Sequence, residues 1–122
     1  MKLIPEEIRQ RLPGLASMTQ ANPIQKWIAQ ARFVDPETRI SWYLIEFDGQ
    51  DRFFGLMVGK HAVAGEFSLT ELESLGEESD EAGLVYLDRS FQPAALIDLA
   101  RQNSSIAELL PPPSEGLVDL VP

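Results

Sequence analysis

Residues 39–59, RISWYLIEFDGQDRFFGLMVG, decide the fold of this 122-residue chain. Asp48-Gly49 indicates a tight hairpin turn, because this pair readily adopts the positive backbone angles that such a turn needs. Before the turn, side chains alternate between two faces, with Ile40, Trp42 and Leu44 on one and Tyr43, Ile45 and Phe47 on the other. Residues 52–59 alternate in the same way, so two antiparallel strands are predicted. Both are apolar on both sides, which predicts central strands that are at least partly covered on both faces.

Further strands are expected on either side of this hairpin. Residues 27–33 alternate with the period of a half-buried strand, and Asp35-Pro36 begins the turn that follows it. Residues 59–65 suggest a loop, residues 66–68 a short fourth strand, and residues 84–91 another extended segment. Together these segments predict an antiparallel meander of about four or five strands.

Three short helices are expected to pack on this sheet. The first, over residues 3–12, carries an apolar stripe and stops at Pro13-Gly14. The second begins with Ser68 as N-cap, with Glu71 three residues on as in a capping box, and ends at Gly76 before an acidic loop over residues 77–81. The third runs from Pro93 to about Arg101, and Ser104 or Ser105 caps a final turn that ends at Leu110. The fold class is therefore α+β, with one domain over residues 1–110 and a proline-rich tail over residues 111–122.

Charge is distributed unevenly along the chain. Residues 1–60 have a net charge of +1 and residues 61–122 a net charge of −10, which makes −9 for the whole. A protein binds phosphate groups through clustered Lys and Arg side chains, which this chain lacks. Direct binding to nucleic acid or to an anionic membrane is therefore not expected. A basic protein is the partner that this balance favours, although acidic residues also serve simply to keep a surface soluble.

The densest acidic stretch is the candidate partner-binding site. It contains seven acids and no base, namely Glu66, Glu71, Glu73, Glu77, Glu78, Asp80 and Glu81. In the stronger interpretation, these carboxylates imitate a nucleic-acid backbone and occupy the basic groove of a nuclease or restriction enzyme. In the weaker interpretation, they are a solvated surface.

Few catalytic chemistries fit this composition. There is no cysteine and one histidine, His61, which has no nucleophilic serine motif to serve. Gly59-Lys60 lacks the preceding glycine and the following Ser or Thr of a phosphate-binding loop. We therefore expect a non-enzymatic protein with no metal and no cofactor. An enzyme or small-molecule site on the exposed side of the sheet remains the alternative, with Tyr43, Glu71 and Arg89 as its polar groups.

The chain carries no apolar run long enough to span a membrane and no signal peptide, so a cytoplasmic location is expected. Its oligomeric state cannot be deduced from the sequence.

Several blocks resemble a bacterial family of small proteins of unknown function that are often encoded on plasmids, phages and other mobile elements. These are MKLIPEEI at residues 1–8, SWY at 41–43, FFGLMVG at 53–59, EFSLTELES at 66–74 and DRSFQP at 88–93. The resemblance carries over no catalytic residue. It implies a role in countering or accompanying host functions such as restriction or plasmid maintenance.

Overall fold

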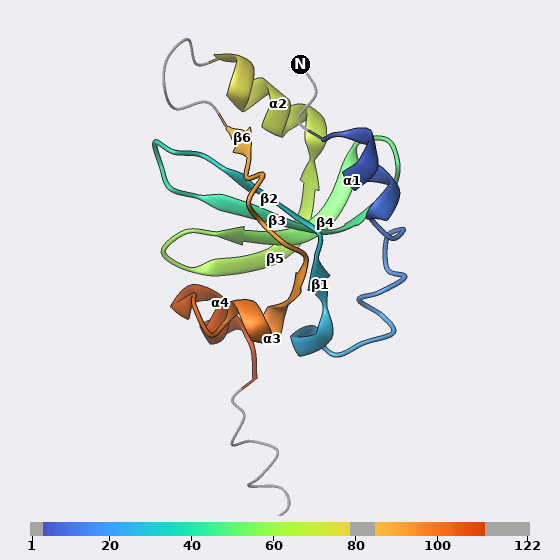
Figure 1. The fold of residues 1–122 in the computed structure, drawn as a ribbon, viewed down its shortest axis with the longest axis vertical. Coiled ribbons are helices and arrows are strands. Elements are labelled where there is room, and N and C mark those ends of the chain that lie inside the picture. Colours follow the sequence, from blue (N-terminus) through green and yellow to red (C-terminus); the bar gives the residue numbers. More distant parts are fainter. Residues whose placement is uncertain (1–3, 79–84, 112–122) are drawn as a thin grey trace, which may run out of the picture.

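A computed structural model describes residues 4–78 and 85–111, and its framework is a five-stranded antiparallel sheet (Figure 1). The strand order is β5-β4-β3-β2-β6, so β2 to β5 form a meander and β6 pairs with the outer side of β2. The strands span Ala31–Val34 (β2), Ser41–Phe47 (β3), Arg52–Val58 (β4), Ala62–Ser68 (β5) and Tyr86–Leu87 (β6). The predicted α+β class with an antiparallel meander is confirmed.

A smaller sheet connects this framework to the C-terminal helices. Its two strands are β1 (Ile28–Ala29) and β7 (Ala94–Ala95), and β7 continues directly into α3 (Leu96–Leu99). The other helices are α1 (Glu6–Arg11), the 3-10 helix η1 (Ile24–Lys26), α2 (Leu69–Glu78) and α4 (Ser104–Leu109). In Figure 1, α3 and α4 lie together at the lower end of the sheet, while α1 and α2 lie towards the other end.

Apolar side chains form a separate core on each face of the sheet. Neighbouring residues of a strand point to opposite faces, so β3 contributes Trp42 to one core and Tyr43 to the other. The first core is covered by α1 and α2, which add Ile8 and Leu72. The second is covered by α3 and α4 through Leu96 and Ile106. The expectation that the central strands are covered on both faces is thus met.

A β-bulge interrupts the alternation within β3. The pairing register between β3 and β4 shifts between Leu44 and Glu46. Because the extra residue changes the phase of the strand, Phe47 joins Trp42 and Leu44 in the first core. The prediction that Phe47 shares a face with Tyr43 and Ile45 was therefore wrong.

Other strand boundaries also differ from those predicted. The expected strand over residues 27–33 is divided at Gln30 into β1 and β2, which belong to different sheets. The expected loop over residues 59–65 ends early, because β5 begins at Ala62 and pairs with β4 along its whole length. The alanines and the glycine of β5 have little intrinsic preference for a strand, but pairing with β4 outweighs this weak preference. Within the extended segment expected at residues 84–91, only Tyr86–Leu87 forms a strand among the described residues.

Three helix ends were also mispredicted. Helix α2 continues through Gly76 to Glu78, so the expected acidic loop does not begin at residue 77. The third helix begins at Leu96 instead of Pro93, because the two residues before it pair with β1. Asn103 caps α4 in place of the predicted serines, since its side-chain oxygen accepts the N–H of Ile106 at 3.1 Å.

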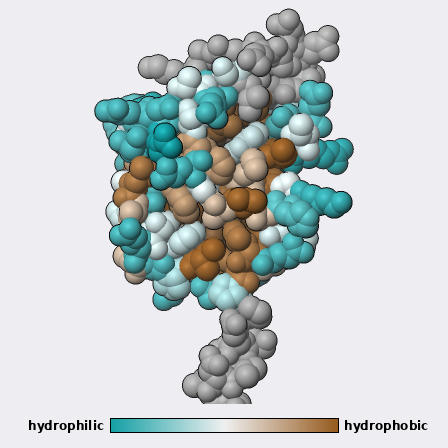
Figure 2. Space-filling model, turned by 180° about the vertical axis from the view of Figure 1, so that it is seen from behind, coloured by the Kyte–Doolittle hydropathy of each residue, from teal (hydrophilic) through white to brown (hydrophobic). Residues whose placement is uncertain are grey.

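Part of the apolar surface is not covered. Figure 2 shows apolar side chains gathered across the middle and lower part of one face, bordered by hydrophilic ones. Among the described residues, the most exposed large apolar side chains are Val63, Tyr86 and Ile97.

Within the described ranges, no helix combines the length and apolar character needed to cross a membrane. The tail beyond Pro111 lies outside the described residues, so its separation from the domain stays a prediction.

Candidate functional site

The structure places five of the seven acidic candidates, one on β5 and four on α2. Glu66 on β5 is exposed and forms an ion pair with Arg52 at 3.2 Å. Glu71 is exposed in the first turn of α2, and Glu73 is half-buried two residues later. Glu77 and Glu78 continue α2, but their side chains, together with Asp80 and Glu81, lie outside the described part of the chain.

The start of α2 is attached to the turn between β3 and β4. The hydroxyl oxygen of Ser68 accepts the N–H of Glu71 at 3.3 Å, which makes Ser68 the N-cap as predicted. The carboxylate of Asp51 accepts hydrogen bonds from the Ser68 hydroxyl at 2.7 Å and the Thr70 N–H at 2.8 Å, and also from the Thr70 hydroxyl. The Thr70 hydroxyl contributes most to lowering the pKa of Asp51, followed by the Ser68 hydroxyl. The acidic helix is therefore firmly fixed where it leaves the sheet.

The three residues of the alternative ligand site lie in different parts of the fold. Tyr43 is buried in the core beneath α3 and α4, with the ring of Phe91 against it at 5.7 Å. Glu71 is on α2, which covers the opposite face of the sheet. Arg89 is exposed in the segment after β6. Among the described residues, no hydrogen bond joins any two of the three, and of the three only Arg89 lines the pocket described below.

A polar cluster beside Tyr43 fixes the segment that follows β6. Arg32 on β2 donates to the carboxylate of Asp88 at 2.8 Å and to the hydroxyl of Ser41 at 3.0 and 3.2 Å. Its guanidinium also lies 5.8 Å from the ring centre of Tyr43. The Ser90 hydroxyl contributes most to lowering the pKa of Asp88, and Arg32 lowers it further. Burial raises the pKa of Tyr43. Because Arg32 and Asp88 already satisfy each other, this cluster is suited to holding the chain in place.

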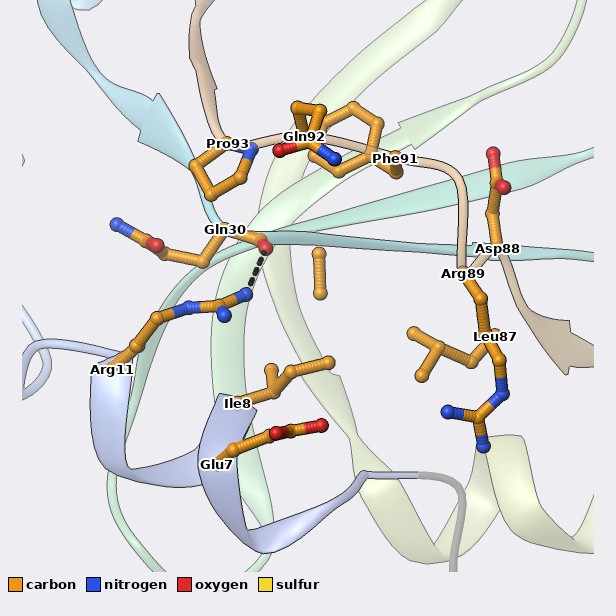
Figure 3. Close-up of a pocket in the computed structure, with 11 residues that line it drawn as sticks. Glu7, Ile8, Arg11, Gln30, Leu87, Asp88, Arg89, Phe91, Gln92 and Pro93 are labelled. Carbon is orange, nitrogen blue, oxygen red and sulfur yellow. Dashed lines mark hydrogen bonds between the residues drawn. The ribbon is translucent and has the colours of Figure 1, made fainter.

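A pocket of about 210 Å³ lies between α1 and the segment after β6 (Figure 3). Arg11 and Arg89 stand on opposite sides of it, and the carboxylate of Glu7 lies between them. Apolar side chains, including Ile8 on α1 and Phe91 after β6, form part of its wall. The pocket thus combines charges of both signs with an apolar surface.

Sequence reasoning found Arg89 but missed Glu7 and Arg11. Glu7 and Arg11 are four residues apart, which places both side chains on the same face of α1. This spacing was the only sign in the sequence that the two could act together. The sequence could not indicate that the segment after β6 would lie opposite them. Among the residues described, no group of three or more acids or histidines is arranged to hold a metal ion.

In comparisons with known proteins, no family model matches the chain, and no curated protein or solved structure is significantly similar to it. The resemblance to the mobile-element family therefore stays a prediction from the sequence.

Proposed function

We propose that this chain is a non-enzymatic accessory protein that binds a basic protein partner through the acidic segment at residues 66–81. One observation carries the proposal: no Lys or Arg occurs between Lys60 and Arg89, while seven acids lie between residues 66 and 81. Such a concentration of one charge steers encounter with a surface of opposite charge.

The attachment of α2 supports this assignment. Asp51 and Ser68 hold the first turn of the helix against the sheet, so Glu71 projects from a fixed position. A charge that is already in place loses less conformational freedom on binding than one on a free segment. Glu66 on the adjacent strand adds a second exposed carboxylate, although Arg52 partly neutralises it.

In its narrower form, the proposal is that the segment acts as a DNA mimic. Its carboxylates would then occupy the phosphate-binding groove of a nuclease or restriction enzyme and block access by DNA. The resemblance to proteins from mobile elements favours such a target, because these elements must survive host restriction. Fold and genetic setting alone are weak grounds for function, so the charge of the segment remains the principal argument.

The test compares two sets of charge reversals with the unmodified protein. The first variant combines Glu71→Lys, Glu77→Lys and Glu78→Lys. Its matched control combines Glu37→Lys, Asp98→Lys and Glu108→Lys, which makes the same change in net charge elsewhere. Each protein is used to capture binding partners from a host lysate at about 0.1 M and about 0.5 M salt, with the partners identified by mass spectrometry. Screening shortens from ~10 Å to a few ångström across this range.

We expect one basic partner to be retained at low salt by the wild type and the control, and to be lost at high salt or with the first variant. Retention by the first variant, with circular dichroism unchanged, would contradict the role of α2. For the DNA mimic, duplex DNA should release the captured partner in a dose-dependent way. If the partner stays bound in the presence of saturating DNA, the mimic is rejected.

A further inference from the structure

We propose that the pocket between α1 and the segment after β6 binds a small zwitterion, an α-amino acid with an apolar side chain. This site is separate from the acidic segment and independent of the function proposed above. It is built from residues of α1, the β1–β2 connection and residues 87–93.

Two of the charged groups that line the pocket have no partner among the described residues. Arg89 and Glu7 are both exposed, and neither forms an ion pair or a side-chain hydrogen bond with another described residue. In Figure 3, the Glu7 carboxylate points into the space between the two arginines. The pocket therefore offers a free cation and a free anion to a ligand.

Two further charged residues have their orientation fixed by the protein. Arg11 donates one N–H to the carbonyl oxygen of Gln30 at 3.1 Å, which holds its guanidinium at the wall and leaves other donors available. The charge of Asp88 is already paired, because its carboxylate forms an ion pair with Arg32 and also accepts hydrogen bonds from Ser90. Among the described residues, the charges at the pocket without an ion pair are thus two positive and one negative, in a chain whose net charge is −9.

The remaining wall and the size of the pocket limit the ligand further. Ile8 and Ala31 are buried, and Leu87 and Phe91 are half-buried, which gives a smaller apolar surface beside the polar and charged groups. A volume of about 210 Å³ corresponds to roughly seven water molecules at ~30 Å³ each. A single amino acid fits this space.

An amino acid matches each part of the site. Its carboxylate can accept paired hydrogen bonds from Arg89 or Arg11, its ammonium group can pair with Glu7, and its side chain can rest on the apolar wall. A simple carboxylic acid or a dianion would match the arginines but would be repelled by Glu7. An amine without a carboxylate would leave both arginines without an anion. Only the zwitterion satisfies both signs of charge.

The test uses L-leucine and two analogues that each lack one charged group. Isocaproate lacks the ammonium and isoamylamine lacks the carboxylate, while both keep the apolar chain. Binding to the full-length protein is followed by calorimetry and by ligand-detected NMR. L-Valine, L-methionine and L-phenylalanine are included so that the conclusion does not depend on one side chain. We expect at least one of the four amino acids to bind, and each analogue of leucine to bind about tenfold more weakly than leucine itself, since a charge-assisted hydrogen bond contributes ~1.5–3 kcal/mol.

Two variants then locate the site. Arg89→Gln and Glu7→Gln should each weaken binding about tenfold or more for the same reason. Arg101→Gln and Glu37→Gln remove exposed charges of the same type outside the pocket and should leave binding unchanged. The proposal is overturned if none of the four amino acids binds at millimolar concentration, or if leucine binds and isocaproate binds as tightly as leucine. It is also overturned if the control variants weaken binding as much as the pocket variants.

Discussion

The carboxylate of Glu46 accepts a 2.7 Å hydrogen bond from the backbone N–H of Thr19, which lies 27 residues earlier in the chain. The Glu46 side chain is only 1% exposed. It also accepts the N–H groups of Ala16 and Met18, each at 2.8 Å, and the hydroxyl of Thr19. A single acid on β3 therefore supplies the hydrogen-bond acceptors for three residues of one loop. Ala16, which donates to this carboxylate, has a positive φ of 67°, a value that non-glycine residues seldom adopt.

Replacing this carboxylate by an amide should destabilise the protein. In Glu46→Gln, the side-chain NH2 faces backbone N–H groups that have no other acceptor, so at least one buried donor is left unpaired. We expect the free energy of unfolding to fall by about 2–4 kcal/mol, measured by urea denaturation at pH 7. Glu37→Gln, an exposed acid in a turn, should change it by less than ~0.5 kcal/mol. Equal effects of the two substitutions would show that Glu46 does not anchor the loop.

The same residue predicts how stability depends on pH. Burial by itself would raise the pKa of Glu46, but the hydrogen bonds from Thr19, Ala16 and Met18 outweigh it and lower the pKa below the ordinary value of 4.5. Its contribution to stability is therefore complete above that value and is lost as pH falls through the pKa of the folded state. Unfolding free energies should be compared for the wild type and Glu46→Gln between pH 7 and pH 3. The gap between the two proteins should narrow below about pH 4.5, and parallel curves would contradict the prediction.

The central strands could be predicted from sequence, because their apolar alternation is local information. Glu46 shows the limit of that reasoning. It stands in an apolar strand, and neighbouring residues do not reveal that its partners lie in a loop far along the chain. The bulge that redirects Phe47 is equally hidden, since it depends on the register with β4. The pocket was missed for the same reason: Arg11 and Arg89 are brought to its two sides only by the folding of the sheet.

The cluster around Arg32 should require arginine specifically. The guanidinium bonds Asp88 and Ser41 simultaneously and lies over the Tyr43 ring. A lysine provides a single point charge that cannot reproduce this planar arrangement. Because both members of the ion pair are partly exposed, we expect Arg32→Lys to cost only about 1–2 kcal/mol in denaturant unfolding. Arg101→Lys, at an exposed position with no ion pair among the described residues, is the control and should be neutral. If Arg32→Lys is also neutral, the cluster does not hold the segment after β6.

Two glycines that face each other in adjacent strands should respond very differently to the same substitution. Gly55 on β4 and Gly65 on β5 are direct partners in the sheet. A Cβ at Gly55 would overlap the carbonyl oxygen of Tyr43, whereas a Cβ at Gly65 meets no atom within 4 Å. The obstacle at Gly55 is backbone within the bulged strand β3, so it cannot move aside as a side chain would.

Gly55→Ala should therefore cost more than the ~1–3 kcal/mol typical of an overpacked core, and part of the protein is expected to be insoluble. Gly65→Ala should keep the wild-type circular dichroism spectrum and an unfolding free energy within about 1 kcal/mol of wild type, because alanine also restricts the unfolded chain. Comparable stability of the two variants would mean that β3 and β4 do not approach as closely as the bulge requires. Destabilisation by Gly65→Ala but not by Gly55→Ala would contradict the open space found beside Gly65.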